Sequence, residues 1–518
     1  MKSDTGNVKA GYFHLGHIEK FFAKADLQDA FQVISNRTFK DLDLEDVFRF
    51  IDRTQSRIGQ QYLYYLLRCI PPNGKRSGQM EDRVNVFLQN PDMRAFVSTE
   101  LSKLSEPGAY HVCSLFQGKH IEAPAWLWLI QALSGISVLL ILLSFFFPQL
   151  WVVLILVFPI NMGIHYWNKT NIYQYSSSIP QLVLMNQVAR KILANNESQH
   201  LTNITASVDS LRRLIPQMSI FRIEAKLQSE IGQLVDYFLE LIKAMLLLES
   251  VVLFATLKKL DSKREDIATV FKFIGETDAA LSVIALRESI PYYCSITPEE
   301  DNKTLSVKGI YHPLLFNGVS NDIVLKDKSA LLTGSNMSGK TTFIRTVGIS
   351  AILGQTLNTC FASEFAMPWM QVLSSIRISD DLLEDKSYYM EEVLTLKQLI
   401  EESQGKKRTL FSLDEVFKGT NSIERIAMSK SVLSYLADNG NLVFVSTHDR
   451  ELTGLLSEHY ELYHFTEVIQ EEEIVFDYKI KPGVLNTTNA IRILELNKFP
   501  TQIIDEAMEV SLRLGQNR

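Results

Sequence analysis

The feature that most constrains the fold is a glycine-bracketed stretch between a short apolar segment and a segment with helical apolar spacing. It runs from Gly334 to Thr341 and has the pattern G-x-x-x-x-G-K-T. Glycines let backbone N–H groups turn inward around an anion, and a helix that begins beside them adds the positive end of its dipole. The pattern predicts a strand, a phosphate-binding P-loop, and a helix from near Lys340. The chain must then contain an α/β domain.

Residues of this loop are the candidates for binding ATP and Mg²⁺. Lys340 is expected to reach the β- and γ-phosphates, and the Thr341 hydroxyl is expected to ligate Mg²⁺. The nucleotide-contacting candidates are Gly334, Ser335, Asn336, Met337, Ser338, Gly339, Lys340, Thr341 and Thr342.

Two later apolar runs end in candidate catalytic residues. Residues 408–413 lead into Asp414 and Glu415, and residues 441–447 lead into His448. Such runs suit buried parallel strands, whose carboxyl ends face the ligand. Asp414 is predicted to hold Mg²⁺ and Glu415 to polarise the attacking water. His448 is predicted to sense the γ-phosphate or to orient water, so the expected reaction is hydrolysis of ATP to ADP and phosphate.

These motifs, in this order, resemble the ATPase domain of the MutS family of mismatch-repair proteins. Residues 333–342 resemble that family's T-G-P-N-M-G-G-K-S-T, with Ser335 and Ser338 in place of proline and glycine. Residues 308–315 resemble the family's lead-in A-R-H-P-L-L, and residues 376–392 resemble its signature R-I-G-A-x-D with S-T-F-M-x-E. Residues 414–421 resemble its D-E-x-x-x-G-T-S box, and residues 446–448 resemble A-T-H. The resemblance runs from about residue 305 to the C-terminus.

The resemblance implies a homodimer formed through the ATPase domains. In that family the signature serine of one subunit contacts the nucleotide of the other, so Ser387 is expected to act in trans, with Glu392 and Asn421 near the interface. DNA is a possible partner for the same reason. Residues 42–63 also resemble the opening of the family's core, and residues 84–94 do so loosely. The family's mismatch-reading domain has no counterpart here, so the residues do not support mismatch recognition.

A second decisive feature is a long stretch without charge. From Ala123 to Asn168 the chain contains no Asp, Glu, Lys or Arg. Residues 126–147 and 150–167 are each long enough to cross a bilayer as a helix, and Pro148-Gln149 separates them. The pattern predicts a transmembrane hairpin that contacts lipid through residues 126–167. The alternative is a hairpin buried in a soluble core, which Gln131 and three serines permit.

The orientation of this hairpin follows from its ends. Trp126 and Trp128 begin the first span, and Tyr166 and Trp167 end the second. All four would lie at one membrane face, as an aromatic belt does, with Lys119 and Lys169 beside it. Both termini then share one side, and the need for ATP makes that side cytoplasmic. The expected location is a membrane protein with two spans and a cytoplasmic ATPase domain.

The remaining composition divides the chain into four expected parts of a mixed fold. Residues 1–118 are predicted to be an all-α core, 119–170 the hairpin, 171–295 a helical lever region with long helices over about 215–260, and 296–518 an α/β P-loop ATPase of the ABC type. Residues 244–254 form either a third membrane span or a buried lever helix. Four scattered cysteines predict neither a zinc site nor a disulfide framework.

The charge balance leaves two classes of function open. The net charge is −7, which gives no global attraction to nucleic acid. Basic clusters at 190–191, 212–213 and 257–264 could be solvated helix faces, DNA contacts or contacts to anionic lipid headgroups. One class is ATP-coupled DNA binding, as in the resembled family. The other is a membrane-tethered ATPase with a signalling or remodelling role and no DNA.

Overall fold

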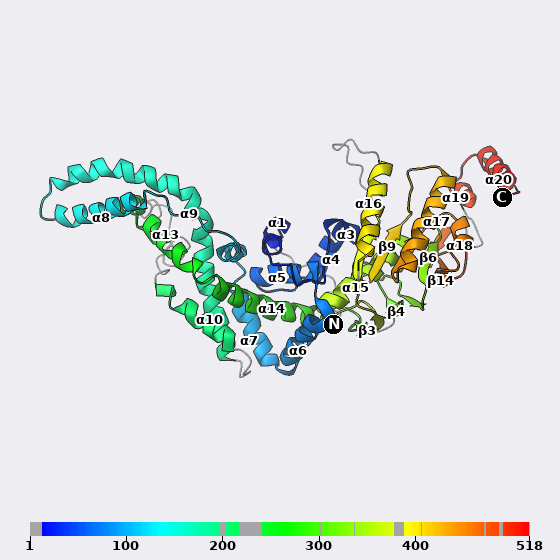
Figure 1. The fold of residues 1–518 in the computed structure, drawn as a ribbon, viewed down its shortest axis with the longest axis horizontal. Helices are drawn as coiled ribbons and strands as arrows, with labels where there is room; N and C mark the ends of the chain where they lie inside the picture. The colour runs from blue at the N-terminus through cyan, green and yellow to red at the C-terminus, as the bar shows by residue number, and fades with distance from the viewer. Residues whose placement is uncertain are drawn as a thin grey trace.

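A computed structural model describes residues 13–195, 202–216, 241–299, 303–335, 337–377, 388–405, 407–470, 473–485 and 490–516. The molecule is elongated, with an α/β domain at one end, a helical body in the middle and two long helices protruding at the other end (Figure 1). The predicted mixed fold, helical first and α/β towards the C-terminus, is confirmed in this arrangement.

The α/β end is built on a six-stranded sheet with the order β14-β11-β6-β10-β9-β8. Neighbours pair in parallel except β14, which is antiparallel to β11. The strands are β6 (Ser329–Thr333), β8 (Gln371–Ser375), β9 (Thr409–Asp414), β10 (Leu442–Ser446), β11 (Tyr460–His464) and β14 (Lys481–Pro482). The three strands predicted from apolar runs, β6, β9 and β10, therefore lie side by side at the centre, with β10 between the other two.

Alternate residues of these strands point to two different cores. Leu410 and Phe444 face the helix α15 (Lys340–Leu357), in a cluster that continues into the helical body. Phe411 and Val443 face the other side, where α16 (Tyr388–Ser403) and α17 (Ser422–Asp438) cover the sheet. This period-two alternation is what a strand buried on both faces produces. One face of the sheet thus shares a continuous core with the helical body.

Smaller elements complete the α/β end. A four-stranded sheet has the order β3-β7-β4-β5, and β12 pairs with β13 as a hairpin. The bounds are β3 (Thr297–Pro298), β4 (Leu305–Ile310), β5 (Asn321–Leu325), β7 (Glu364–Met367), β12 (Glu467–Gln470), β13 (Glu473–Phe476), α18 (Glu451–Leu455), α19 (Ala490–Leu496) and α20 (Thr501–Gln516).

The helical body is organised around two helices in close contact, α5 (Arg57–Arg68) and α14 (Arg264–Ser289). A Cβ atom at Gly59 would lie 2.1 Å from the Asp278 carboxylate, and one at Gly275 would lie 2.5 Å from the Tyr62 ring, so only glycine fits at either position. Asp278 accepts hydrogen bonds from the backbone N–H groups of residues 55 and 56 at 2.8 and 2.7 Å, just before α5 begins. Residues 51–63, which resemble a family motif, thus form this packed and capped junction.

The other elements of the body surround this pair. They are α1 (Leu15–Ile18), α2 (Lys20–Ala23), α3 (Asn36–Asp41), α4 (Leu44–Ile51), η1 (Pro72–Gly74), α6 (Lys75–Gln89), α7 (Pro91–Ser102), η2 (Pro107–Leu115) and α10 (Thr202–Arg212), with the short antiparallel pair β1 (Gln32–Val33) and β2 (Cys69–Ile70). The described part of residues 1–118 is helical as expected, apart from this strand pair.

The protruding helices are α8 (Leu127–Ser144) and α9 (Leu150–Ala194), and they form the expected antiparallel hairpin. The turn between them contains Pro148 and Gln149, as predicted. The boundary expected near residue 170 does not end a helix, however, because α9 continues for 45 residues into the body. Residues 169–179 contain neither glycine nor proline, so nothing in the sequence terminates the helix there.

A second difference concerns the long helices expected over residues 215–260. Within the described residues, a helical stretch ends at residue 246, and α13 (Leu248–Asp261) begins two residues later. Leu247 between them has a left-handed backbone, with φ of 51°. No glycine or proline announces this break, because its stability comes from packing against the hairpin: Leu247 is fully buried.

Candidate functional site

The predicted P-loop joins the central strand β6 to α15. The strand ends at Thr333 and the helix begins at Lys340, as the motif predicts. Gly334 and Gly339 have φ values of 138° and 103°, in the region that favours glycine. A Cβ atom at Gly334 would also lie 2.6 Å from the Phe465 carbonyl oxygen. Both motif glycines are therefore required by backbone geometry.

The two serines that depart from the family pattern fit this loop without strain. Neither Ser335 nor Ser338 has a positive φ. The Ser338 hydroxyl donates a hydrogen bond to the Ser335 carbonyl at 2.7 Å, which closes the loop from within. Met337 is exposed, and Asn336, a predicted nucleotide contact, lies outside the described residues.

Lys340 lies in the mouth of the loop. It is 2% exposed, and its Nζ donates to the carbonyl oxygens of Gly334 and Ser335, both at 2.7 Å. Burial lowers the pKa of this amine, while the nearby carboxylates of Asp414 and Glu415 act in the opposite direction. A lysine ammonium on the inner side of a glycine loop is the group that contacts terminal phosphates.

The predicted Mg²⁺ ligands are in direct contact. The Thr341 hydroxyl donates to Asp414 Oδ2 at 3.0 Å, and the Ser446 hydroxyl donates to the other carboxylate oxygen. Within the described residues no group of three or more His, Cys, Asp or Glu side chains could bind a metal ion. A hydroxyl and a carboxylate beside a phosphate loop fit Mg²⁺, which takes few protein ligands and fills its shell with water and phosphate oxygens.

Glu415 follows directly in an unusual backbone conformation. Its φ is 50°, and its N–H donates to the Ser446 carbonyl on the neighbouring strand at 2.9 Å. Its carboxylate lies 2.8 Å from His448 Nε2 and 3.3 Å from Lys418 Nζ. The hydrogen bond from His448 is the main cause that lowers the pKa of Glu415 to about 2. The carboxylate is therefore ionised at neutral pH, as a group that polarises water must be.

The turn that carries Glu415 is attached to α16 by a buried carboxylate. Glu392 accepts hydrogen bonds from the backbone N–H groups of Phe417 at 2.5 Å and Lys418 at 3.3 Å. Phe417 also has a positive φ, so the turn contains two non-glycine residues in the left-handed region. Burial raises the pKa of Glu392. The family resemblance suggested only a place near a subunit interface for this residue; the structure shows that it contacts the catalytic turn of its own chain.

A cavity of about 450 Å³ opens beside the P-loop. Gly339, Thr341 and Thr342 line one side of it. Aromatic residues from distant segments line the rest: Tyr311, Phe316, Phe343, Phe465 and Tyr478. His312 also lines it, and burial lowers the pKa of its imidazole to about 4, so the ring is neutral. Flat apolar walls beside a phosphate loop fit a planar base.

Sequence reasoning missed most of this aromatic pocket. The lead-in motif around His312 marks one wall, but Phe465 and Tyr478 belong to no motif. They come to the loop because β11 pairs with β6 and the chain returns after the β12–β13 hairpin. Among the predicted site residues, Lys340, Thr341, Asp414, Glu415 and His448 do meet, while Ser387 lies outside the described residues.

Together, the loop after β6, the buried lysine and the acidic pair at the end of β9, two strands away in the same parallel sheet, define a P-loop nucleoside triphosphatase. The family model for MutS domain V matches residues 330–515. The chain therefore carries the ATPase domain of the MutS family, and it is an ATP-hydrolysing enzyme by that domain.

Part of the chain is also similar to curated proteins of this family. The chain is 28% identical over 263 residues to the DNA mismatch repair protein MutS of Natronomonas pharaonis, which covers 48% of this chain and 30% of that protein. It is 31% identical over 260 residues to the DNA mismatch repair protein MutS of Listeria monocytogenes, with 48% and 30% covered. The match to Staphylococcus haemolyticus MutS is 30% over 252 residues, with 46% and 28% covered. The alignments thus span about three-tenths of these relatives' length.

Proposed function

We propose that this protein is a membrane-anchored MutS-type ATPase, in which ATP hydrolysis at one end of the molecule drives a conformational change relative to a bilayer at the other. In this proposal residues 296–518 form the motor, residues 1–118 and 171–295 the body and lever, and residues 119–170 the anchor. One observation carries the proposal: the same chain contains an exposed hairpin without charged residues and a P-loop site.

The residues of the site divide the chemistry between them. Lys340 and the loop amides bind the phosphates of ATP, and Thr341 and Asp414 hold Mg²⁺. Bound Mg²⁺ would neutralise charge on the phosphates. Glu415 polarises the attacking water, and His448 keeps that carboxylate ionised and oriented through its 2.8 Å contact. The aromatic pocket beside the loop receives the base.

Contacts from the helical body support coupling between the site and the rest of the molecule. Asp41, at the end of α3, accepts hydrogen bonds from the backbone N–H groups of Ile376 and Arg377, just beyond β8, at 3.1 and 3.0 Å. Arg37, on the same helix, lies 3.1 Å from Glu391 on α16. A movement of α16 or of the segment after β8 would therefore be transmitted directly to the body.

The P-loop helix has a similar contact. Asp43, between α3 and α4, pairs with Arg345 of α15 at 3.1 Å and with Arg377 at 2.8 Å. The body thus contacts three elements that surround the nucleotide site: α15, α16 and the end of β8. Nucleotide-dependent motion of an ATPase dimer, with Ser387 acting in trans as in the family, would reach the body through these pairs.

The hairpin supports the membrane anchor by its exposure. Both helices are long and apolar enough to cross a membrane, and only 22% and 17% of their spans are buried. Phe145 and Phe146, at the tip, are 81% and 79% exposed. A core helix of a soluble protein would be mostly buried, and an apolar surface this large in water would be costly. This exposure favours lipid over the alternative of a buried soluble hairpin.

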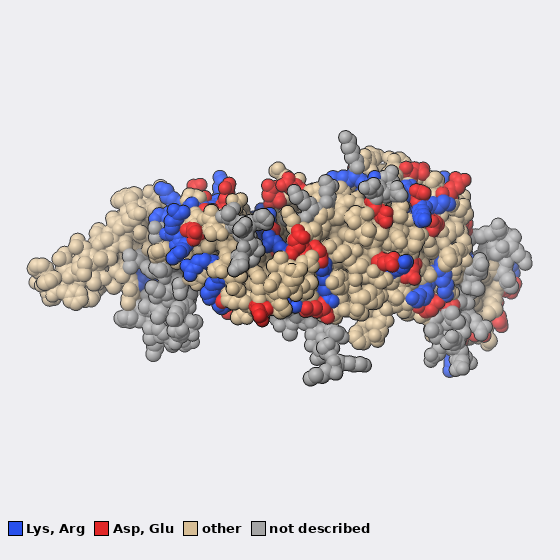
Figure 2. Space-filling model, turned by 90° about the horizontal axis from the view of Figure 1, so that it is seen from below, with Lys and Arg blue, Asp and Glu red and all other residues tan. Residues whose placement is uncertain are grey.

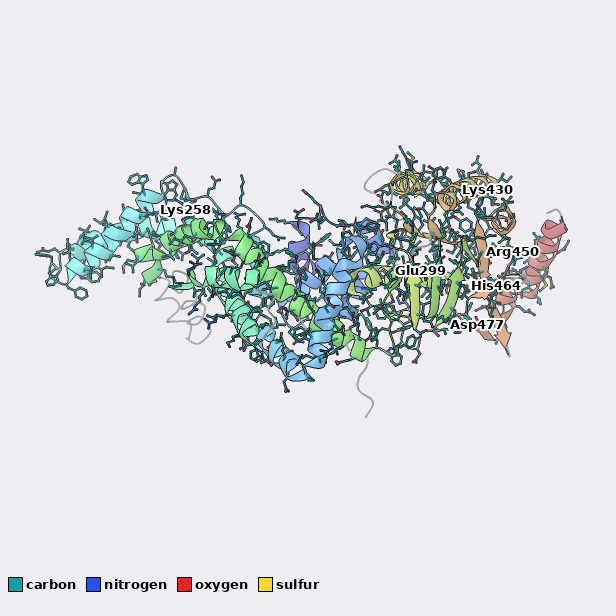
Figure 3. The ribbon with its side chains drawn as sticks, turned by 60° about the horizontal axis from the view of Figure 1, so that its bottom comes forward. Lys258, Glu299, Lys430, Arg450, His464 and Asp477 are labelled. Atoms are coloured by element: carbon teal, nitrogen blue, oxygen red, sulfur yellow. The ribbon has the colours of Figure 1, made fainter. Side chains whose placement is uncertain are left out.

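Aromatic and basic residues at the base of the hairpin agree with an interface position. The rings of Trp126 and Trp167 lie 4.7 Å apart, so both helix ends meet at one level. Figure 2 shows a tip without charged side chains and a band of Lys and Arg where the hairpin joins the body. Lys258, on α13, lies at this base in Figure 3, and Lys119 and Lys259 are also exposed. Basic residues beside a span favour the cytoplasmic side.

DNA binding is the second candidate function. It is suggested by the similar proteins, which are named DNA mismatch repair proteins. The basic clusters support it weakly, because several of their members are already paired. Lys191 lies 3.2 Å from Glu100, and Arg264 lies 2.5 Å from Asp261. The exposed pair Lys258 and Lys259 lies at the base of the hairpin, where lipid headgroups would be the nearer anions.

Two measurements on the full-length protein test these proposals. Membranes washed with alkaline carbonate should retain the protein, because an inserted hairpin resists a treatment that strips adsorbed proteins; release into the supernatant would overturn the anchor. Purified protein in lipid vesicles should hydrolyse ATP without DNA. If added duplex or branched DNA stimulates turnover, and the effect falls steeply with salt, the DNA role is established instead.

A further inference from the structure

We propose that residues 244–257 form a third membrane-embedded element, a re-entrant segment that enters the bilayer beside the hairpin without crossing it. This inference rests on the proposed membrane anchor. It places residues 244–257 in contact with lipid, where the alternative is a buried lever helix. It also gives a reason for the helix break at Leu247.

The first argument is depth. The Ser134 hydroxyl donates to the Leu246 carbonyl at 2.6 Å, and Asn161 Nδ2 donates to the Met245 carbonyl at 2.7 Å. Ser134 is seven residues into α8 from Leu127, or about 10 Å along the helix axis. Asn161 is eleven residues from Leu150 at the tip, or about 17 Å. The break at Leu247 therefore lies well inside the thickness that the hairpin would span.

The second argument is register at the other end of α13. Asp261, its last residue, lies 3.0 Å from His120 Nδ1, just before the hairpin begins. Lys258 and Lys259 are exposed one turn earlier, and Lys258 lies at the base of the hairpin in Figure 3. Helix α13 thus rises from the depth of Ser134 to the level of the basic band, about half the length of a full span.

The third argument is how the broken backbone is satisfied. In lipid an unpaired carbonyl costs several kcal/mol, so a helix break is tolerated only where protein groups supply the partners. Here the hairpin supplies two. Asn161 is fully buried, and its amide also donates to the Ser137 hydroxyl at 2.8 Å. Polar residues that seemed to weaken the hairpin as a membrane span are the ones that cap this break.

The composition of the segment agrees. Ala244, Leu247, Leu253, Phe254 and Leu257 are buried, and α13 contacts both arms of the hairpin. Val251 and Val252 are partly exposed and apolar. The one charged residue between 244 and 257 is Glu249.

The connection of α13 gives the segment a function. Only Ser262 and Lys263 separate it from α14, the helix that packs on α5 at the centre of the body. A membrane-embedded α13 would link the bilayer to the body core by a second route besides α9. Two routes would fix the orientation of the body, where one would allow it to swivel.

The test uses an environment-sensitive fluorophore on single cysteines of the full-length protein in phosphatidylcholine–phosphatidylglycerol vesicles. Cys294, the partly exposed native cysteine, is replaced by serine, since Cys69, Cys113 and Cys360 are buried. Val251→Cys and Lys258→Cys form a matched pair on one face of α13, two turns or about 10 Å apart. Ile136→Cys, exposed on α8, reports the hairpin itself.

Nitroxide lipids then report depth. The label at 136 should lose fluorescence to a nitroxide deep in the acyl chains, the label at 251 to a nitroxide at a shallower position of the acyl chains, and the label at 258 to a headgroup nitroxide. If 136 responds to the acyl nitroxide but 251 responds only to aqueous iodide, the re-entrant segment is overturned and the anchor stands. If 136 also responds only to iodide, the anchor itself is overturned.

A second measurement addresses the capping groups. In Ser134→Ala with Asn161→Leu, the carbonyls of Met245 and Leu246 lose their donors, so amide hydrogen exchange over residues 244–251 should become faster in vesicles. Ser144→Ala is the control, because the Ser144 hydroxyl bonds to Ile141 within its own helix. Unchanged exchange in the double variant would show that these side chains do not stabilise an embedded break.

Discussion

The two ends of this molecule use apolar runs in opposite ways. Phe411 and Val443, in the central strands of the ATPase sheet, are fully buried, because helices cover both faces. Phe145 and Ile155, in equally apolar runs of the hairpin, are 81% and 66% exposed. Composition does not separate the two cases. The difference is whether other elements of the chain pack over the apolar residues. At the hairpin end, among the described elements, α13 packs along one side.

Polar residues differ between the ends as well. At the ATPase end Lys340 begins α15 and Asp414 ends β9, and both lie beside the P-loop. In the hairpin Ser137 and Asn161 turn towards each other and towards the backbone. Polar side chains at the ATPase site are placed to bind a ligand. These polar side chains of the hairpin instead form hydrogen bonds with other groups of the protein. If the two ends are independent in this way, a substitution at one end should leave the property of the other end unchanged.

The largest effect is expected from charges on the exposed face of the hairpin. Ile136→Arg with Leu139→Arg should remove the protein from the carbonate-resistant membrane fraction, because each arginine near the middle of a span costs about 3 kcal/mol. Leu88→Arg is the control, since Leu88 is an exposed apolar residue of the body. Full membrane retention in the double variant would mean that this face contacts water or protein.

The next effect concerns the phosphate loop alone. Lys340→Ala should lower ATP turnover by about 10²–10³-fold, because the phosphate charge loses its buried cationic partner. Membrane retention should not change. Lys326→Ala, an exposed lysine between β5 and β6, serves as the control. Near-normal turnover in Lys340→Ala, measured by phosphate release, would contradict the assignment of the site.

A smaller effect is expected at Glu392, which holds the turn after Glu415 through hydrogen bonds from Phe417 and Lys418. Glu392→Ala should lower kcat by about tenfold and leave KM within about twofold, because the N–H groups of Phe417 and Lys418 lose their acceptor. Glu392→Gln keeps an acceptor oxygen and should recover most of the rate. The adjacent Glu391→Gln should leave kcat unchanged, since Glu391 faces Arg37. A rise in KM alone would indicate a binding role instead.

The smallest effect is a shift in pH dependence. His448 is the main cause that lowers the pKa of Glu415 to about 2 from 4.5, so in the native protein Glu415 stays ionised above about pH 4 and is protonated only as the pH falls through 2. In His448→Gln that pKa should rise, so the acidic limb of the kcat profile, which Glu415 places below about pH 4 in the native protein, should move to higher pH. An unmoved limb would show that another group sets it.

The sequence predicted those parts of the site in which neighbouring residues set the local geometry. The G-x-x-x-x-G-K-T stretch specifies its own loop, because Gly334 and Gly339 must take positive φ. The acidic pair could be placed because an apolar strand ends there. The aromatic pocket could not, since Phe465 and Tyr478 reach the loop only through strand pairing far along the chain.

The same distinction applies to the helical parts. The hairpin turn at Pro148 was predictable from local residues, and so was the meeting of Trp126 with Trp167. The break at Leu247 was not, because leucine favours a helix and the carbonyls beside the break are bonded by Ser134 and Asn161, which lie far away in the sequence. The continuation of α9 beyond residue 170 was missed because a change of composition was taken for a change of structure.

That continuous helix makes the anchor a mechanical part of the molecule. Its 45 residues correspond to a rod of about 68 Å. Beyond the apolar span the rod is clamped: a Cβ atom at Gly108 of η2 would lie 3.1 Å from the Ser177 carbonyl, and Asn186 donates to the Val208 carbonyl at 3.2 Å. The helix is not interrupted between the apolar half and the clamped half, although it bends where it enters the body in Figure 1 and contains Pro159 and Pro180. If nucleotide binding rotates the body, α9 would transmit that rotation to the bilayer as a torque. The stiffness and thickness of the membrane would then oppose the conformational changes of the ATPase cycle.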